Sequence, residues 1–234
     1  MSSINVDPAE VEKFQVIASR WWDAAGEFKS LHDINPLRID YIDRQAGGLA
    51  GKKVLDIGCG GGILAEGLAS RGAIVTGIDV ADQSLQVAKM HLHESALQVN
   101  YQLSTAEEFS AHHANEFDLV TCLEMLEHVP DPGSVITAAA RALKPGGVLV
   151  LSTLNRNPKS FALAIVGAEY VLGLIPRGTH QYRKFIKPSE LAGAVRAEGL
   201  RVCDLSGLQY NPLTRTYSLG TDIDVNYLMA CTDG

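Results

Sequence analysis

Two acidic residues beside a glycine-rich turn give the first indication of chemistry. The stretch VLDIGCGGGILAEGLA joins a short apolar run to a helical pattern through a cluster of glycines. Glycine lets a ligand approach the backbone closely, and the start of a helix offers free N–H groups. Asp56 precedes Gly58 by two residues, and its carboxylate would repel a pyrophosphate but suit an amino group. We therefore expect the cofactor S-adenosylmethionine (AdoMet), which has an ammonium group and no phosphate. A helix-entry cap is the alternative reading of Asp56.

The second acidic residue, Asp79, closes the apolar run AIVTGID about 20 residues further on. This is the usual position of a carboxylate that bonds two ribose hydroxyls, and both NAD and AdoMet carry such a ribose. Gly60, Gly62 and Ala65 also match the dinucleotide pattern G-x-G-x-x-A, so an NAD dehydrogenase remains an alternative. Asp56 is the argument against it.

The stretch CLEMLEHVPDP holds groups that could serve a methyl acceptor. If the acceptor is a phenol with a pKa near ~10, about 4 kcal/mol separates it from its reactive anion at neutral pH. Glu124, Glu127 and His128 are spaced i, i+3, i+4 and would share a face of a helix. An imidazole could accept the phenolic proton, so we expect His128 and Glu124 to be catalytic. The three side chains could instead bind a divalent ion, with Mg²⁺ or Mn²⁺ favoured over zinc, or form an acidic first turn.

An alternation of strands and helices would position these residues. The runs KVLDIG, AIVTGID, VNYQL, FDLVTCL and GVLVLST are continuously apolar, which is typical of strands covered by helices on both faces. LRVCDLSG and DVNYLMAC predict two later strands. The expected fold class is α/β, with a doubly wound, mostly parallel seven-stranded sheet of Rossmann-like type. Residues 8–45 predict a helical arm, which Trp21 and Trp22 would pack onto the sheet.

The chain reads as one methyltransferase domain, residues 1–234. We expect an N-terminal helical arm over 1–50, an AdoMet-binding core over 51–155, a membrane and substrate insertion over 156–188, and a C-terminal helix and strands over 189–234. A net charge of -7 argues against nucleic acid as a partner. The polar N-terminus resembles neither a secretory signal nor a transit peptide, so we expect a cytoplasmic protein.

The insertion contains the apolar stretch SFALAIVGAEYVLGLIP, residues 160–176. It is too short to span a bilayer, which takes roughly 20 apolar residues. Residues 156–187 carry six basic side chains and one acidic one, a net +5, so the rest of the chain carries -12. This pattern predicts peripheral binding to the inner face of the cytoplasmic membrane through anionic lipids. Contacts are expected at Ile165, Leu172, Arg183, Lys184 and Lys187; a buried core helix is the alternative.

Five segments together resemble one family. KFQVIASRWWD with GEFKSLHDINPLR, LDIGCGGG, EMLEHVPDP, STLNRNPKS and GAEYVLGLIPRGTH are similar to the ubiquinone-biosynthesis O-methyltransferases, which are class I AdoMet-dependent methyltransferases. The resemblance covers nearly the whole chain. It implies methylation of phenolic hydroxyls on polyprenylated ubiquinone precursors, namely 3-demethylubiquinol and 2-polyprenyl-6-hydroxyphenol. Other enzymes of ubiquinone biosynthesis are implied as partners.

The same resemblance implies AdoMet contacts at Arg38, Gly58, Asp79 and Leu123; at Leu123 the relatives have a methionine. Arg38 also has a physical reading, because its guanidinium can grip the carboxylate of AdoMet bidentately. In eukaryotic relatives the acidic and histidine trio is associated with a divalent ion, which implies Mg²⁺ at Glu124, Glu127 and His128. Two other hypotheses remain open: a soluble methyltransferase for another small metabolite, and an AdoMet-binding module without catalysis.

Overall fold

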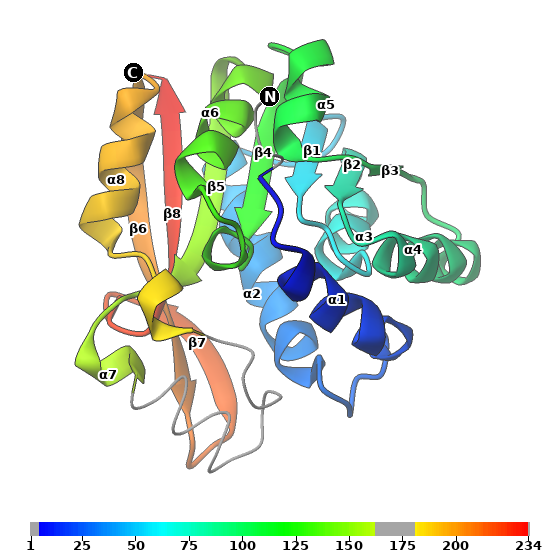
Figure 1. The fold of residues 1–234 in the computed structure, drawn as a ribbon, viewed down its shortest axis with the longest axis horizontal. Helices are drawn as coiled ribbons and strands as arrows, with labels where there is room; N and C mark the ends of the chain where they lie inside the picture. Colours follow the sequence, from blue (N-terminus) through cyan, green and yellow to red (C-terminus); the bar gives the residue numbers. More distant parts are fainter. Residues whose placement is uncertain (1–4, 162–180, 234) are drawn as a thin grey trace.

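A mixed sheet of eight strands runs through the part of the chain that the computed structural model describes, residues 5–161 and 181–233 (Figure 1). The strand order is β3-β2-β1-β4-β5-β8-β6-β7. Five strands are parallel: β1 (Lys53–Ile57), β2 (Ile74–Asp79), β3 (Val99–Leu103), β4 (Phe117–Leu123) and β5 (Leu143–Leu154). Three antiparallel strands complete the sheet: β6 (Leu200–Asn211), β7 (Thr216–Gly220) and β8 (Asn226–Asp233).

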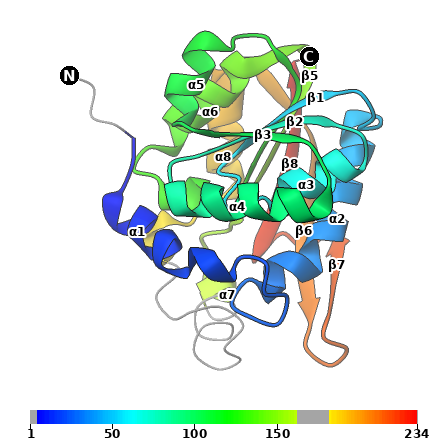
Figure 2. The same ribbon diagram turned by 90° about the vertical axis from the view of Figure 1, so that its right-hand side faces the viewer.

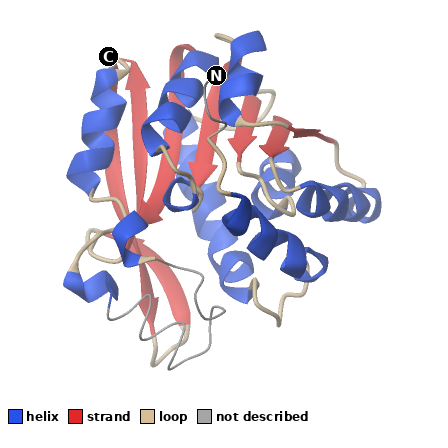
Figure 3. Cartoon of the chain, viewed as in Figure 1, coloured by secondary structure: helices blue, strands red, loops and turns tan. Residues whose placement is uncertain are grey.

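Helices cover both faces of the sheet (Figure 3). One face packs against α2 (Lys29–Ala46), α3 (Ile63–Ser70) and α4 (Asp82–Ser95). The other packs against α5 (Ala106–His112), α6 (Pro132–Ala142) and α8 (Pro188–Ala197). Within β1, Val54 belongs to the first layer of the core, and Leu55 and Ile57 belong to the second. The strands are apolar on both sides because helices cover both faces of the sheet, as the sequence predicted. The predicted α/β class is confirmed.

The sheet has eight strands in the described residues where the sequence predicted seven, and the strand that was not predicted is β7. It pairs with the end of β6 as a hairpin, in which Tyr210 lies opposite Tyr217. Its residues are half-buried or exposed, so β7 lacks the continuous apolar run that marks the central strands. The hairpin projects beyond the helix-covered part of the sheet (Figure 1).

The first helix of the N-terminal arm lies across the carboxyl ends of β1, β2 and β4, and the arm then continues onto one face of the sheet (Figures 1 and 2). It consists of α1 (Pro8–Ile17), a 3₁₀ turn η1 (Ala18–Arg20) and α2. The Asp7 side chain caps α1 by accepting from the Ala9 N–H at 3.1 Å. Pro36 lies inside α2 rather than at its start, so Arg38 is a mid-helix residue.

Two tryptophans hold this arm on the glycine turn and its neighbours. Trp22 Nε1 donates to the carbonyl of Gly61 at 2.9 Å, and Trp21 Nε1 donates to Ser84 Oγ at 3.2 Å. Trp22 also stacks on His91, with ring centroids 3.3 Å apart. The tryptophans are packing residues of the arm, as expected, but they pack on the turn and α4 rather than on the sheet.

The predicted insertion is only partly described. α7 (Pro158–Ser160) and the 3₁₀ turn η4 (Tyr182–Lys184) lie on either side of residues 162–180. The expected membrane contacts at Ile165 and Leu172 fall outside the described residues. None of the helices in residues 5–161 and 181–233 has the length and apolar character needed to cross a membrane.

Candidate active site

A cavity of about 680 Å³ opens where the arm covers the carboxyl ends of the central strands. Its walls come from the glycine turn, the loop after β4, the arm and the β6–β7 hairpin. Most of the residues singled out in the sequence line it: Arg38, Asp56, Gly58, Gly60, Asp79, Leu123, Glu124 and His128. Parallel strands bring these distant residues to one edge, where open α/β sheets bind their ligands.

The glycine turn has a conformation and surroundings that require glycine. Gly58 has φ 72° and Gly60 has φ 53°, in the left-handed region. A Cβ on Gly58 would lie 2.6 Å from Met125, and one on Gly61 would lie 2.4 Å from Trp21. The turn therefore keeps its backbone close to both neighbours and open to a ligand in the cavity.

Asp79 organises this turn from the end of β2. Its carboxylate accepts from the N–H groups of Gly60 and Ala81, both at 2.8 Å. Burial raises the pKa of Asp79, and the two backbone donors act in the opposite direction. Each carboxylate oxygen can accept more than one bond, so the group can also meet a pair of hydroxyls in the cavity.

Asp56 is a buried carboxyl with one oxygen left over. Its Oδ1 accepts from Thr121 Oγ1 at 2.7 Å, and its Oδ2 has no hydrogen-bond partner among the described residues. Burial raises the pKa of Asp56 to about 7. A cationic group in the cavity would favour the ionised carboxylate and supply the missing partner, so this position fits the ammonium of AdoMet.

Arg38, which is buried, and Glu124, which is half-buried, form an ion pair in the cavity wall. Arg38 Nη2 donates to Glu124 Oε1 at 2.9 Å. Ser152 Oγ and Asn226 Nδ2 donate to the same carboxylate at 2.7 Å and 3.0 Å. Glu124 therefore fixes the arginine at the cavity. A guanidinium carries five N–H donors, so this pairing is compatible with a second carboxylate on Arg38.

The structure corrects the expected helical face of Glu124, Glu127 and His128. Glu124 has φ 53°, and the following residues form a 3₁₀ turn, η2 (Leu126–His128). The three side chains therefore diverge. Glu127 is buried and lies outside the cavity lining. Its carboxylate accepts a hydrogen bond from Thr153 Oγ1 at 2.8 Å. Burial and the nearby Glu124 raise the pKa of Glu127 to about 7. In residues 5–161 and 181–233, no group of three His, Cys, Asp or Glu side chains is placed to hold a metal, so the trio as arranged does not fit Mg²⁺.

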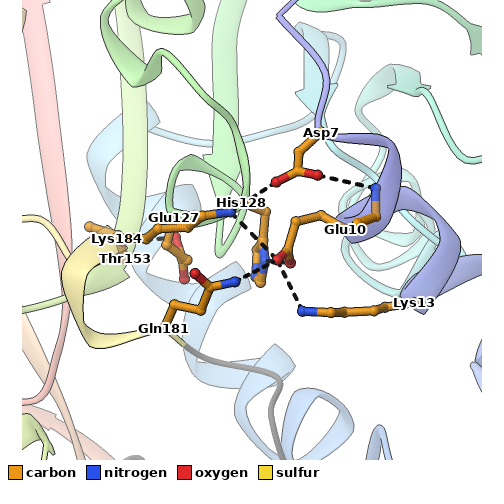
Figure 4. Close-up of polar contacts among 9 residues, drawn as sticks. Asp7, Glu10, Lys13, Glu127, His128, Thr153, Gln181 and Lys184 are labelled. Carbon is orange, nitrogen blue, oxygen red and sulfur yellow. Dashed lines mark hydrogen bonds and ion pairs between the residues drawn. The ribbon is translucent and has the colours of Figure 1, made fainter.

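His128 lines the cavity and makes a contact that the sequence did not predict. Its Nδ1 lies 3.0 Å from Glu10 Oε2, on the arm helix α1 (Figure 4). The Phe14 ring meets the imidazole edge-on at 5.1 Å. Glu10 lies 118 residues before His128 and has the pattern of an ordinary charged helix residue, so only the fold reveals the pair.

The basic residues expected at lipid have different surroundings. Lys184 Nζ lies 3.2 Å from Asp7 Oδ2 and 3.5 Å from Glu10 Oε1, so it faces the arm. Arg183 and Lys187 are exposed. The Lys187 backbone N–H donates to Glu190 Oε2 at the start of α8, which leaves its side chain outside that cap.

Comparison with known proteins defines the class first. Residues 31–205 match the family model described as a methyltransferase domain. The structure of magnesium protoporphyrin IX methyltransferase from Synechocystis PCC 6803 with bound SAM has the same fold, with a TM-score of 0.65 and 16% identity over 100% of both chains. The fold is that of the AdoMet-dependent methyltransferases.

The chain belongs to the ubiquinone biosynthesis O-methyltransferase family. It is 60% identical over 227 residues to the protein of that name from Aromatoleum aromaticum, with 97% of each chain covered. It is 61% identical over 226 residues to the one from Thiobacillus denitrificans, again with 97% of each covered. The family expected from the sequence segments is confirmed.

Proposed function

We propose that this protein transfers the methyl group of AdoMet to a phenolic hydroxyl of polyprenylated ubiquinone precursors. The acceptors are 3-demethylubiquinol and 2-polyprenyl-6-hydroxyphenol. The observation that carries the proposal is that Asp56, whose buried carboxyl has no second partner among the described residues, shares one cavity with His128. A group suited to a cationic methyl donor and a group suited to a phenolic proton thus line the same space. The names of the relatives support an O-methyl product in ubiquinone biosynthesis.

Different residues of the cavity bind different groups of the methyl donor. Asp56 meets the ammonium, Asp79 accepts from the ribose hydroxyls, and Arg38 grips the carboxylate. Leu123 packs against the adenine, and the glycine turn at Gly58 leaves room for the donor beside the backbone. When bound, AdoMet supplies an electrophilic methyl group, and the protein supplies position and a base.

His128 acts on the acceptor. The phenolic O–H passes its proton to Nε2 of His128, and an oxygen electron pair forms the bond to the methyl carbon. The electrons of the broken C–S bond stay on sulfur, which becomes a neutral thioether. The products are the methyl ether, S-adenosylhomocysteine and an imidazolium that returns its proton to solvent. This base removes part of the ~4 kcal/mol that separates a neutral phenol from its anion.

His128→Ala tests this function. We expect methylation of a prenylated catechol to fall by ~10²–10⁴-fold, the usual contribution of general-base catalysis, while affinity for AdoMet changes little. Raising the pH should partly restore the rate, because the phenolate then forms without help. Turnover equal to that of the wild type would contradict the role of His128.

The same proposal places the enzyme at the membrane where its substrate resides. We propose that it is a cytoplasmic protein bound peripherally to anionic lipid, through residues 156–188. Their net charge of +5, in a chain of -7, supports this, as do the exposed side chains of Arg183 and Lys187. Other enzymes of ubiquinone biosynthesis are proposed partners there.

A further inference from the structure

Glu10 is a buried carboxylate at the meeting point of three segments. Only 4% of the residue is exposed, and it lies on α1 of the arm. Its Oε2 is 3.0 Å from His128 Nδ1, and its Oε1 accepts from Lys13 Nζ at 3.0 Å. Gln181 Nε2 and Lys184 Nζ also approach Oε1, at 3.2 Å and 3.5 Å (Figure 4). The carboxylate thus joins the arm, the loop after β4 and the chain that follows residue 180.

Such burial needs a reason, because a carboxylate removed from water is costly unless it is paired and hydrogen-bonded. The hydrogen bond from His128 lowers the pKa of Glu10 to about 2, and that from Lys13 adds to it, against the effect of burial. Glu10 is therefore an anion at neutral pH. An anion beside an imidazole nitrogen accepts from it, which places a proton on Nδ1.

We propose that Glu10 is a positioning residue for His128. Glu10 holds the imidazole with its proton on Nδ1, so that Nε2 is the atom that takes the phenolic proton. A base oriented by a third group is a recurring arrangement in enzymes that activate hydroxyls. The inference rests on the proposed function, because it assigns a task within that reaction. It also means that α1 of the arm completes the active site.

The contacts of Lys184 extend this arrangement. Lys184 bonds Glu10 and also Asp7, the residue that caps α1. It therefore ties α1 to the last part of the predicted membrane insertion. Lys184→Met would remove this tie while the Glu10 and His128 side chains stay as they are. We expect it to lower the rate by less than Glu10→Ala does.

The test compares Glu10→Gln, Glu10→Asp and Glu10→Ala with the wild type. Glu12→Gln is the matched control, because Glu12 is an exposed residue of the same helix. We expect Glu10→Gln and Glu10→Ala to lower kcat on the order of 10- to 100-fold, as loss of an orienting carboxylate does at other sites. Glu10→Asp should retain part of the wild-type rate, and Glu12→Gln should retain all of it. The Kd for AdoMet should stay within about 2-fold, since Glu10 has no expected part in binding it.

A spectroscopic readout separates positioning from a merely structural role. ¹⁵N NMR of histidine-labelled protein, with the His128 signals assigned from His128→Gln, reports which ring nitrogen carries the proton. We expect the proton on Nδ1 in the wild type and a mixture of tautomers in Glu10→Ala. An unchanged tautomer, or a parallel loss of kcat, AdoMet binding and melting temperature in Glu10→Gln, would overturn the proposal. A wild-type enzyme that methylates no prenylated catechol yet shows the Nδ1 proton would refute the function and leave only the hydrogen bond.

Discussion

Asp56 on β1 and Thr121 on β4 lie opposite each other in the parallel ladder and share a 2.7 Å hydrogen bond. That bond occupies Oδ1, while Oδ2 is buried without a partner among the described residues, and Asp56 lines the cavity. The two neighbouring strands thus hold the Asp56 carboxyl in place through Oδ1, and Oδ2 is the oxygen left to bond a ligand.

The first prediction concerns the proton on Asp56. Burial raises its pKa to about 7, so at pH 6 much of the group is protonated in the free protein. An ammonium in the cavity favours the ionised form. Binding of AdoMet at pH 6 should therefore release close to one proton, and the release should fade above pH 8. Calorimetry in buffers of different ionisation enthalpy measures it.

Two variants sharpen that experiment. Asp56→Asn should abolish the release and weaken binding by at least ~10-fold, because a hydrogen bond to a charged group contributes ~1.5–3 kcal/mol. Glu127→Gln is the control, since Glu127 also has a pKa of about 7 but lies outside the cavity lining. If Glu127→Gln abolished the proton release and Asp56→Asn did not, the proton would come from Glu127, and the prediction for Asp56 would be wrong.

The pKa of Asp56 also predicts how stability depends on pH. The folded protein binds this proton more tightly than the unfolded chain, whose Asp has an ordinary pKa near 3.8. The contribution of Asp56 to the free energy of unfolding therefore falls as pH rises from about 4 to about 7. Urea unfolding without ligand should show Asp56→Asn gaining on the wild type between pH 5 and pH 8. A constant difference over that range would contradict the buried, protonated state.

Asp79→Ala should remove AdoMet binding. Its carboxylate is positioned for two ribose hydroxyls, and losing two charge-assisted bonds should weaken affinity by about 100-fold or more. Circular dichroism should show the fold retained. Asp82→Ala is the matched control, because Asp82 is exposed at the start of α4 and bonds Gln86 rather than the glycine turn. Equal losses in both variants would remove Asp79 from the ligand site.

The contact between Trp21 and the glycine turn predicts the effect of Gly61→Ala. The new Cβ would lie 2.4 Å from the indole, so the arm must shift. We expect a loss of ~1–3 kcal/mol in the free energy of unfolding and a change in tryptophan fluorescence. Gly193→Ala in α8 meets nothing within 4 Å and should stabilise the protein by ~0.5–1 kcal/mol. A neutral Gly61→Ala would show that the arm does not pack on the turn in solution.

Membrane binding is tested by cosedimentation with phosphatidylglycerol or cardiolipin vesicles. The wild type should bind at low salt and dissociate as salt rises. Each Lys or Arg near anionic lipid contributes ~1 kcal/mol, so Arg183→Glu with Lys187→Glu should weaken binding strongly and leave methylation of a water-soluble catechol intact. Lys89→Glu with Arg201→Glu makes the same charge change at two other exposed positions and should have a smaller effect. Equal losses in the two pairs would assign binding to net charge alone.

The central sheet and the cavity residues could be predicted because their signals are local. A strand such as β4 is mostly apolar and almost wholly buried, and parallel strands place Asp56, Asp79 and His128 at one edge. β7 lacked that signal, because an edge hairpin strand is only half-buried.

The rest depends on contacts between distant residues. The spacing of Glu124, Glu127 and His128 predicted a helix, but Glu124 adopts a left-handed backbone and bonds Ser152 and Asn226. Tertiary bonds overrode the local pattern there. Glu10 could not be found from spacing at all, since only the packing of α1 over the sheet edge brings it to His128.

The most direct measurement is the site of methylation. Wild-type protein is incubated with methyl-labelled AdoMet and 2-polyprenyl-6-hydroxyphenol, and the product is identified by mass spectrometry and NMR. We predict one labelled methyl group per molecule on the phenolic oxygen, with S-adenosylhomocysteine formed in equal amount. A label on ring carbon, or AdoMet binding without transfer to the prenylated phenol, would contradict the account.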